Sequence, residues 1–228
     1  FMIEANVAAA ETLEEQNMPC VYRVHDAPDK EKLTGLKEFL SSLNLPFALG
    51  ERMRPELFNR ILIKAKGTDH WDAVNQSILR AQSQARYDPK NIGHFGLARS
   101  RYAHFTSPIR RYSDLLVHRA LIQGGDFGND GLSAEEANGL SEISEHISNT
   151  ERRAMVAERD ANDRYMAAFM SEKTGAEFDA RINGVARAGL FLTLLENGAD
   201  GLLPMRYLYD DYYKHDERQN SLVGERSG

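Results

Sequence analysis

The sequence predicts an α+β fold, with a helix-rich part over residues 1–174 and a β-rich part over residues 175–228. In the first part, apolar side chains recur at the three- and four-residue spacing of amphipathic helices, in one segment after another. After Gly175, short segments alternate apolar and polar side chains, and Asn197-Gly198 is a hairpin signal. The change of period at Gly175 predicts two domains.

Composition narrows the class of protein. The 228 residues are 42% hydrophobic and 27% charged, as in a globular protein, and no apolar run approaches the length that crosses a membrane. The single Cys20 excludes an internal disulfide framework and a cysteine-based zinc site. We therefore expect a cytoplasmic protein that does not associate with membranes. The net charge of −6 argues against non-specific coating of nucleic acid but permits a local basic channel.

Helices dominate the first 87 residues. Ile3, Val7, Ala10 and Leu13 predict a helix over 1–17, where Asn6 lies beside the apolar stripe. A buried amide there is more often a satisfied core group than a functional one. Pro19 ends this helix and the alternation after it predicts a strand over 20–25. Helix start signals then predict helices from about 28 to 44, 55 to 66 and 69 to 87.

The segment 94–119 carries the densest chemistry. His94–Ala98 reads as a strand, Ser107 as a helix N-cap and Pro108 as the first helical residue. Arg110 and Arg111 would then lie in the first turn, where the helix dipole disfavours cations. Five arginines against one aspartate give the segment a charge of +4. A phosphate bound among the arginines would explain this pattern; a solvated or carboxylate-paired helix start is the alternative.

A long helix follows. Ser133 and Glu136 form a capping box, and an apolar stripe continues to about Lys173. Glu151 and Glu158 lie seven residues apart on one face of this helix. Two interpretations remain open: an ion pair with Arg110 or Arg111, or a catalytic role for Glu158.

The β-rich part reads as the opening of a five-stranded OB barrel, with strands over 177–182, 189–194 and 201–204. Phe191 and Tyr213 are the aromatic residues that we expect to stack on bases, although many barrel aromatics are core residues. The wider set of candidates is Phe178, Tyr207, Tyr209 and Tyr212.

Several motifs occur in the order found in one enzyme family. They are FMIEANVAAAETL, PCVYRVHDAP, GHFGLA, HFTSPIRRYSDLLVHR and ERRAMVAERD. Together they resemble the RNase II/RNase R (RNB) family of exoribonucleases, and its RNase R branch most closely. The resemblance makes residues 1–174 the C-terminal portion of an RNB catalytic domain. Residues 175–228 resemble the N-terminal portion of an S1 RNA-binding domain.

The resemblance implies a function and a set of site residues. The parent protein would be a hydrolytic exoribonuclease that degrades single-stranded RNA from its 3′ end to nucleoside 5′-monophosphates. Arg110 and Glu158 take the catalytic positions of the SPIRRY and AERD motifs. The expected RNA-binding residues are Arg111, His104, Tyr112, Arg101, Phe191 and Tyr213.

The family also implies magnesium, which activates water and stabilises the charge on the phosphorus. The family's metal-binding aspartates lie in the N-terminal half of the catalytic domain, and no such motif occurs in this sequence. Neither Glu135-Glu136 nor Asp210-Asp211 makes a convincing metal site. We therefore expect no metal ligand here, a partner in the missing N-terminal half, and an inactive fragment. A non-catalytic RNA-binding module is the main alternative, and a helical scaffold a weaker one.

Overall fold

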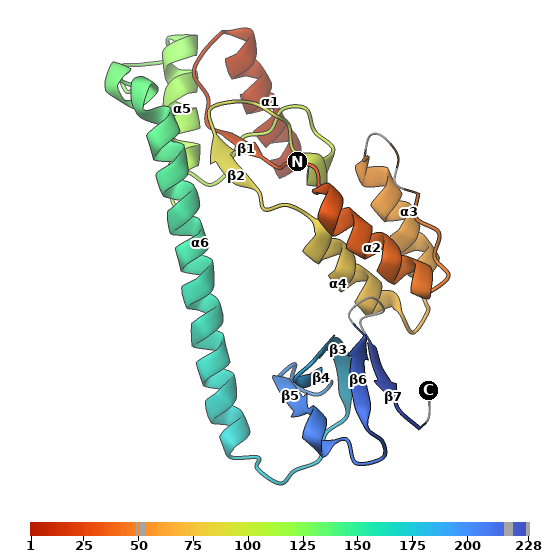
Figure 1. Cartoon of the computed structure of the whole chain (residues 1–228). Coiled ribbons are helices and arrows are strands. Elements are labelled where there is room, and N and C mark those ends of the chain that lie inside the picture. The colour runs from red at the N-terminus through yellow and green to blue at the C-terminus, as the bar shows by residue number, and fades with distance from the viewer. Residues whose placement is uncertain (49, 51–52, 217–220, 227–228) are drawn as a thin grey trace. The chain divides into compact units, whose positions relative to one another are not determined.

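The computed structural model describes residues 1–48, 50, 53–216 and 221–226 (Figure 1). Helices and small antiparallel sheets make up the chain, so the predicted α+β class is confirmed. The chain forms two compact units. Unit 1 comprises Phe1–Lys32, Leu49–Arg60 and Ile78–Val156, and unit 2 comprises Leu33–Ala48, Ile61–Ser77 and Ala157–Gly228. The domain boundary expected at residues 174–175 stays a prediction.

The helices and strands follow the predicted order for most of the chain. The α-helices are α1 (Met2–Glu15), α2 (Lys30–Ser42), α3 (Pro55–Ala65), α4 (Trp71–Ala81), α5 (Tyr112–Gly125) and α6 (Ala134–Ser171). The strands are β1 (Tyr22–Val24), β2 (Arg86–Asp88), β3 (Ala180–Ala186), β4 (Gly189–Leu194), β5 (Asp200–Pro204), β6 (Tyr213–Asp216) and β7 (Ser221–Gly224). The described residues also include two short 3-10 helices, η1 (Phe95–Leu97) and η2 (Met205–Tyr207).

The core of unit 1 joins α1, β1, β2, α5 and the start of α6. Its members include Leu13 of α1, Val24 of β1, Leu116 and Val117 of α5, and Leu140 of α6, all at most 4% exposed. Burial of such aliphatic side chains is the main favourable contribution to folding. Strand β1 pairs antiparallel with β2. The core therefore fixes α5 and α6 against the same small sheet.

The predicted helix over 69–87 is wrong at its C-terminal end. Helix α4 ends at Ala81, and the last residues form β2, in which Tyr87 lies opposite Arg23. Tyr87 is 6% exposed, and its N–H donates to Ser148 Oγ of α6 at 3.0 Å. Pairing with β1 and burial of the ring outweigh the local helical pattern, as tertiary contacts commonly do.

The strand expected at His94–Ala98 is also wrong, because these residues form η1 with isolated bridges at His94. His94 Nδ1 accepts the Leu97 N–H at 3.2 Å, which closes the 3-10 turn. The Gly96 N–H donates to His25 Nδ1 at 2.8 Å, and a Cβ at Gly96 would lie 2.8 Å from that ring nitrogen. The turn therefore requires glycine at this position.

Asn6 is a satisfied core group, the interpretation that the sequence favoured. Its side chain is 4% exposed; Nδ2 donates to Tyr102 Oη and Oδ1 accepts the Phe105 N–H, each at 3.0 Å. Asn6 thus ties α1 to the segment that precedes α5.

We expect Asn6→Ala to lower the free energy of unfolding by about 2–4 kcal/mol, because it leaves the buried Tyr102 hydroxyl and the partly buried Phe105 N–H without this hydrogen-bond partner. Denaturant titration of the variant beside Glu15→Ala, an exposed position on the same helix, measures the difference. A loss below about 0.5 kcal/mol would contradict this account of Asn6.

Unit 2 contains the β-rich part. Strands β3, β4 and β5 form one antiparallel sheet and β6 pairs with β7, among the residues that the structure describes. Gly198 has φ +74° in the turn between β4 and β5, as the Asn-Gly signal predicts. Arg181 of β3 makes an ion pair with Asp72 at the start of α4. The predicted strands at 189–194 and 201–204 are confirmed to within one residue.

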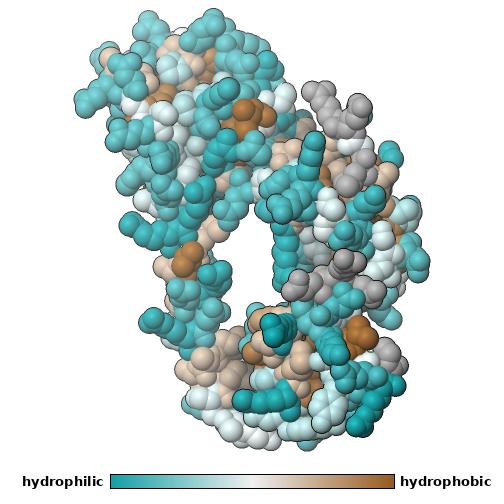
Figure 2. Space-filling model, in the orientation of Figure 1, coloured by the Kyte–Doolittle hydropathy of each residue, from teal (hydrophilic) through white to brown (hydrophobic). Residues whose placement is uncertain are grey.

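The described surface is predominantly hydrophilic on the face shown in Figure 2, with scattered hydrophobic side chains. No helix within the described ranges combines the length and the apolar character that a membrane span requires. The capping box at the start of α6 is confirmed, since the Glu136 N–H donates to Ser133 Oγ and the Ser133 N–H donates to Glu136 Oε2.

Candidate nucleic-acid site

The candidate site in unit 1 is built on the segment from His104 to Arg111, before α5. We predicted that a helix begins at Pro108 under a Ser107 cap, and this is wrong. Helix α5 begins at Tyr112, and its N-cap residue Arg111 is extended, with φ −128° and ψ 121°. The N–H groups of Arg110 and Arg111 donate to the Ser107 carbonyl at 3.3 and 3.2 Å. The arginines therefore lie on a turn in front of the helix.

Asp114 explains why the helix begins late. Its side chain is completely buried, and Oδ1 accepts the Ser107 N–H and Arg111 Nη2, each at 2.8 Å. The Ser107 backbone thus binds a side chain inside the first turn of α5. Burial alone would raise the pKa of Asp114, but the hydrogen bonds from Arg111 and Ser107 outweigh it and hold the pKa below its usual range. Asp114 is therefore a buried carboxylate that is ionised at neutral pH.

Arg111 belongs to this arrangement, and its guanidinium is already paired with a carboxylate. The carboxylate-paired alternative is therefore correct for Arg111, with Asp114 as its partner. Its Nε atom is buried and has no hydrogen-bond partner among the described residues.

Arg110 differs from its neighbour. Its side chain is exposed, and within the described ranges it has no hydrogen bond or ion pair with another side chain. Tyr112 beside it is 45% exposed and Ile109 is fully exposed. The loop and the first residue of α5 thus present a guanidinium and an aromatic ring to solvent, a combination suited to binding phosphate and a base.

His104 directly precedes the loop over residues 105–111, and its partly buried side chain is neutral at neutral pH. Its Nδ1 is hydrogen-bonded to Tyr87 Oη at 3.0 Å, and its ring packs edge-on against Tyr87 and Tyr102. Burial and the positive charges of Arg111 and Arg23 lower the pKa of His104 to about 3. The ring can therefore position Tyr87 by hydrogen bonding but contributes no positive charge at neutral pH.

The Arg101 side chain is paired with a glutamate of α1. Its Nε donates to Glu14 Oε2 of α1 at 2.7 Å, and this hydrogen bond is the main cause that lowers the pKa of Glu14. Both side chains are about 40% exposed, so solvent screens the pair. Nothing in the described contacts brings Arg101 to the Arg110 turn.

The two glutamates of α6 differ in their surroundings. Glu151 accepts a hydrogen bond from Arg23 of β1 at 2.7 Å, and the Arg23 guanidinium lies 4.6 Å from the centroid of the Tyr87 ring. The prediction that Glu151 pairs with Arg110 or Arg111 is therefore wrong, because its partner is Arg23. Glu158 is exposed and makes no side-chain contact of this kind with the described part of the chain. It belongs to unit 2, whereas Arg110 belongs to unit 1.

Unit 2 carries the expected aromatic residues. Phe191 of β4 is 46% exposed, and Tyr213 Oη donates to Asp210 Oδ2 at 2.9 Å. Tyr209 and Tyr212 are more exposed, at 82% and 70%. A cavity of about 630 Å³ is lined by these tyrosines together with Arg206 and Arg226. The wider tyrosine cluster named from sequence is thus as accessible as the two residues chosen from it.

No group of three or more histidine, cysteine, aspartate or glutamate side chains suited to a metal ion occurs in the described residues. Two carboxylates of unit 1 already form ion pairs, Asp114 with Arg111 and Glu151 with Arg23. These described side chains do not fit a magnesium site by themselves.

The fold and the arginine-bearing loop define a mixed helix-and-sheet protein with a candidate anion site. Comparison with solved structures matches it to RNase R of Mycoplasma genitalium in complex with ribose methylated single-stranded RNA. The TM-score is 0.90 at 29% identity, over 99% of this chain and 36% of that chain. A pseudonuclease from yeast shares the fold alone, with a TM-score of 0.72 at 21% identity, over 89% of this chain and 26% of that one.

Sequence comparison gives the same result. Residues 1–124 match the RNB domain. Ribonuclease R of Aquifex aeolicus is 41% identical over 231 residues, which cover 100% of this chain and 32% of that protein. Ribonuclease R of Escherichia coli is 36% identical over 235 residues, covering 100% and 29%. This chain therefore belongs to the RNB domain family, and it spans about a third of the length of these relatives.

Proposed function

We propose that the protein is a cytoplasmic 3′-to-5′ exoribonuclease that hydrolyses single-stranded RNA to nucleoside 5′-monophosphates. One observation carries the proposal: Arg110 of the SPIRRY motif is exposed and without a side-chain partner in the described residues, on a turn that a buried carboxylate holds. Membership of the RNB domain family supports it, as does the likeness to an RNase R solved with single-stranded RNA.

Arg110 and Glu158 are the proposed catalytic residues. In the reaction, water oxygen bonds to phosphorus, the bond from phosphorus to the 3′ oxygen breaks, and that oxygen gains a proton. Arg110 donates hydrogen bonds to the phosphate oxygens and offsets the negative charge that grows in the transition state. Glu158 holds the water or the leaving oxygen by hydrogen bonding.

The remaining proposed RNA-binding residues are aromatic residues, arginines and one supporting histidine. Tyr112, Phe191 and Tyr213 offer rings for base stacking, which contributes roughly 1–3 kcal/mol per base. Arg111 and Arg101 offer positive charge near the RNA backbone, each already paired with a carboxylate. His104 supports the site through its hydrogen bond to Tyr87.

We further propose that magnesium is required and is held by aspartates outside these 228 residues, as the family resemblance implies. Bound magnesium supplies an activated water and neutralises phosphate charge. The residues of this chain contribute the arginine and glutamate side of the site.

The test uses the full-length protein with uniformly labelled single-stranded RNA and chromatographic analysis of the products. We expect nucleoside 5′-monophosphates with magnesium and intact RNA with chelator. Products that carry a 3′-phosphate, or cleavage inside the chain, would contradict the proposal.

A non-catalytic RNA-binding module is the second candidate, because a fold by itself does not determine an activity. Such a module would bind RNA without yielding nucleotides, so the same product analysis separates the two. In either case RNA affinity should fall steeply with added salt, which a helical scaffold would not show.

A further inference from the structure

The loop that carries Arg110 has no regular secondary structure, yet α5 holds it at several points. The His118 Nε2–H donates to the Phe105 carbonyl at 2.8 Å, and the two rings stack with centroids 4.3 Å apart. Asp114 accepts the Ser107 N–H and the Arg111 guanidinium, each at 2.8 Å. Both ends of the Phe105–Arg111 loop are therefore fixed to the same helix.

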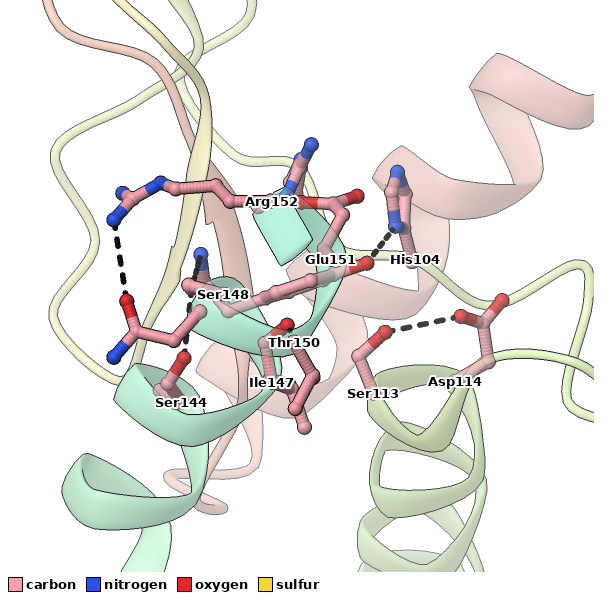
Figure 3. Close-up of polar contacts among 12 residues, drawn as sticks. His104, Ser113, Asp114, Ser144, Ile147, Ser148, Thr150, Glu151 and Arg152 are labelled. Atoms are coloured by element: carbon pink, nitrogen blue, oxygen red, sulfur yellow. Dashed lines mark hydrogen bonds and ion pairs between the residues drawn. The ribbon is translucent and has the colours of Figure 1, made fainter. Parts of the chain in front are cut away.

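Asp114 is the centre of this anchoring. It is completely buried, and its second oxygen accepts the Ser113 hydroxyl at 3.2 Å (Figure 3). A buried carboxylate is tolerated only where hydrogen bonds and a counter-charge compensate for lost hydration. Loss of its charge would leave the Arg111 guanidinium without a counter-charge. The loop conformation therefore depends on the charge of this side chain.

The anchored loop turns outward between its fixed ends. Ile109 and Arg110 are exposed, while the N–H groups of Arg110 and Arg111 are bound to the Ser107 carbonyl. The turn thus sets the direction in which the Arg110 side chain leaves the backbone, and Asp114 and His118 hold the residues that form the turn.

We propose that Asp114, assisted by His118, is a positioning residue that holds the Phe105–Arg111 loop so that Arg110 meets the RNA phosphate, without itself touching RNA. This inference rests on the proposed role of Arg110. Displacement of a catalytic group by about 1 Å can reduce the rate by about 100-fold, so a positioning residue affects turnover more than binding.

The test is a double-mutant cycle in the full-length protein. Cleavage rates of 5′-labelled oligoadenylate with magnesium, and RNA dissociation constants with chelator, are measured for the wild type, Asp114→Asn, Arg110→Ala and the double variant. Val117→Ala, a buried apolar change on the same helix, is the control for lost stability. Asp114→Asn should lower kcat about 10- to 100-fold and change the dissociation constant less than threefold. Val117→Ala should retain kcat within about threefold below its unfolding temperature.

The double variant decides between positioning and general destabilisation. If Asp114 acts through Arg110, Asp114→Asn should lower kcat less than about twofold further once Arg110 is absent. Losses that multiply in the double variant would overturn the proposal. Should Asp114→Asn not fold, His118→Leu takes its place in the cycle, with the same expected result.

Amide hydrogen exchange tests the anchoring independently of activity. The hydrogen-bonded N–H groups of Ser107, Arg110 and Arg111 should exchange at least about tenfold faster in Asp114→Asn than in Val117→Ala, because local opening becomes easier. Unchanged exchange would overturn the anchoring. Absence of RNA cleavage by the wild type would instead reject the proposed function, and with it the effect on turnover, while the exchange result still decides the anchoring.

Discussion

Replacing Arg110 with alanine should lower the rate of RNA cleavage by the full-length protein about 100- to 1000-fold, the usual effect of removing one preorganised donor to transition-state charge. The RNA dissociation constant should change less than threefold, because the other proposed RNA-binding residues remain. The large effect on the rate is expected because the Arg110 guanidinium, unlike that of Arg111, is not paired with a carboxylate in the described residues and can bind phosphate. Single-turnover kinetics with magnesium and binding with chelator separate the two effects.

A matched control for this variant is Arg60→Ala, which removes an exposed arginine of α3 in the same unit. It should leave both constants within about twofold. Equal losses of cleavage and binding in Arg110→Ala would reject a catalytic role and leave only RNA binding.

Glu158→Gln should lower the rate of cleavage about 100-fold or more, the range for loss of a group that handles a proton in the transition state. The substitution keeps the size of the side chain and, at an exposed helical position, should leave stability unchanged within about 0.5 kcal/mol. RNA affinity should not fall, since removal of a negative charge reduces repulsion of phosphate.

Glu145→Gln is the control on α6, because Glu145 is also exposed and lies more than three turns before Glu158. Its kinetics should match the wild type. If the Glu158 and Glu145 variants cleave RNA at the same rate, Glu158 is a solvated surface residue. The glutamate of the AERD motif is then not catalytic in this protein.

Local rules predicted those elements whose signals lie within a few residues. The apolar spacing of α1, the capping box of Ser133 and Glu136, and the Asn-Gly turn before β5 all depend on neighbours in sequence. Strand β2 did not follow such rules: Tyr87 is drawn into the core by β1 and by Ser148 of α6. Pairing between distant segments is not visible in a local helical pattern.

In the candidate site, too, local sequence signals predicted some features, whereas contacts between distant segments were missed. The motif identified Arg110 and Arg111, but their different environments come from Asp114, whose burial the Ser-Pro signal gave no reason to expect. Tyr87, Arg23 and Glu151 were missed as a group because they lie on β2, β1 and α6. The signal that was available was Asp114 itself, an acidic residue in the first turn of α5 beside two arginines.

We propose above that this chain supplies the arginine and glutamate side of a site whose metal ligands lie in another part of the protein. The most direct test incubates the 228-residue chain and the full-length protein separately with 5′-labelled oligoadenylate, with magnesium and with chelator. We predict a magnesium-dependent ladder shortening from the 3′ end for the full-length protein and intact RNA for the chain alone. A magnesium-dependent ladder produced by the chain alone would contradict the claim and place the metal ligands within these residues.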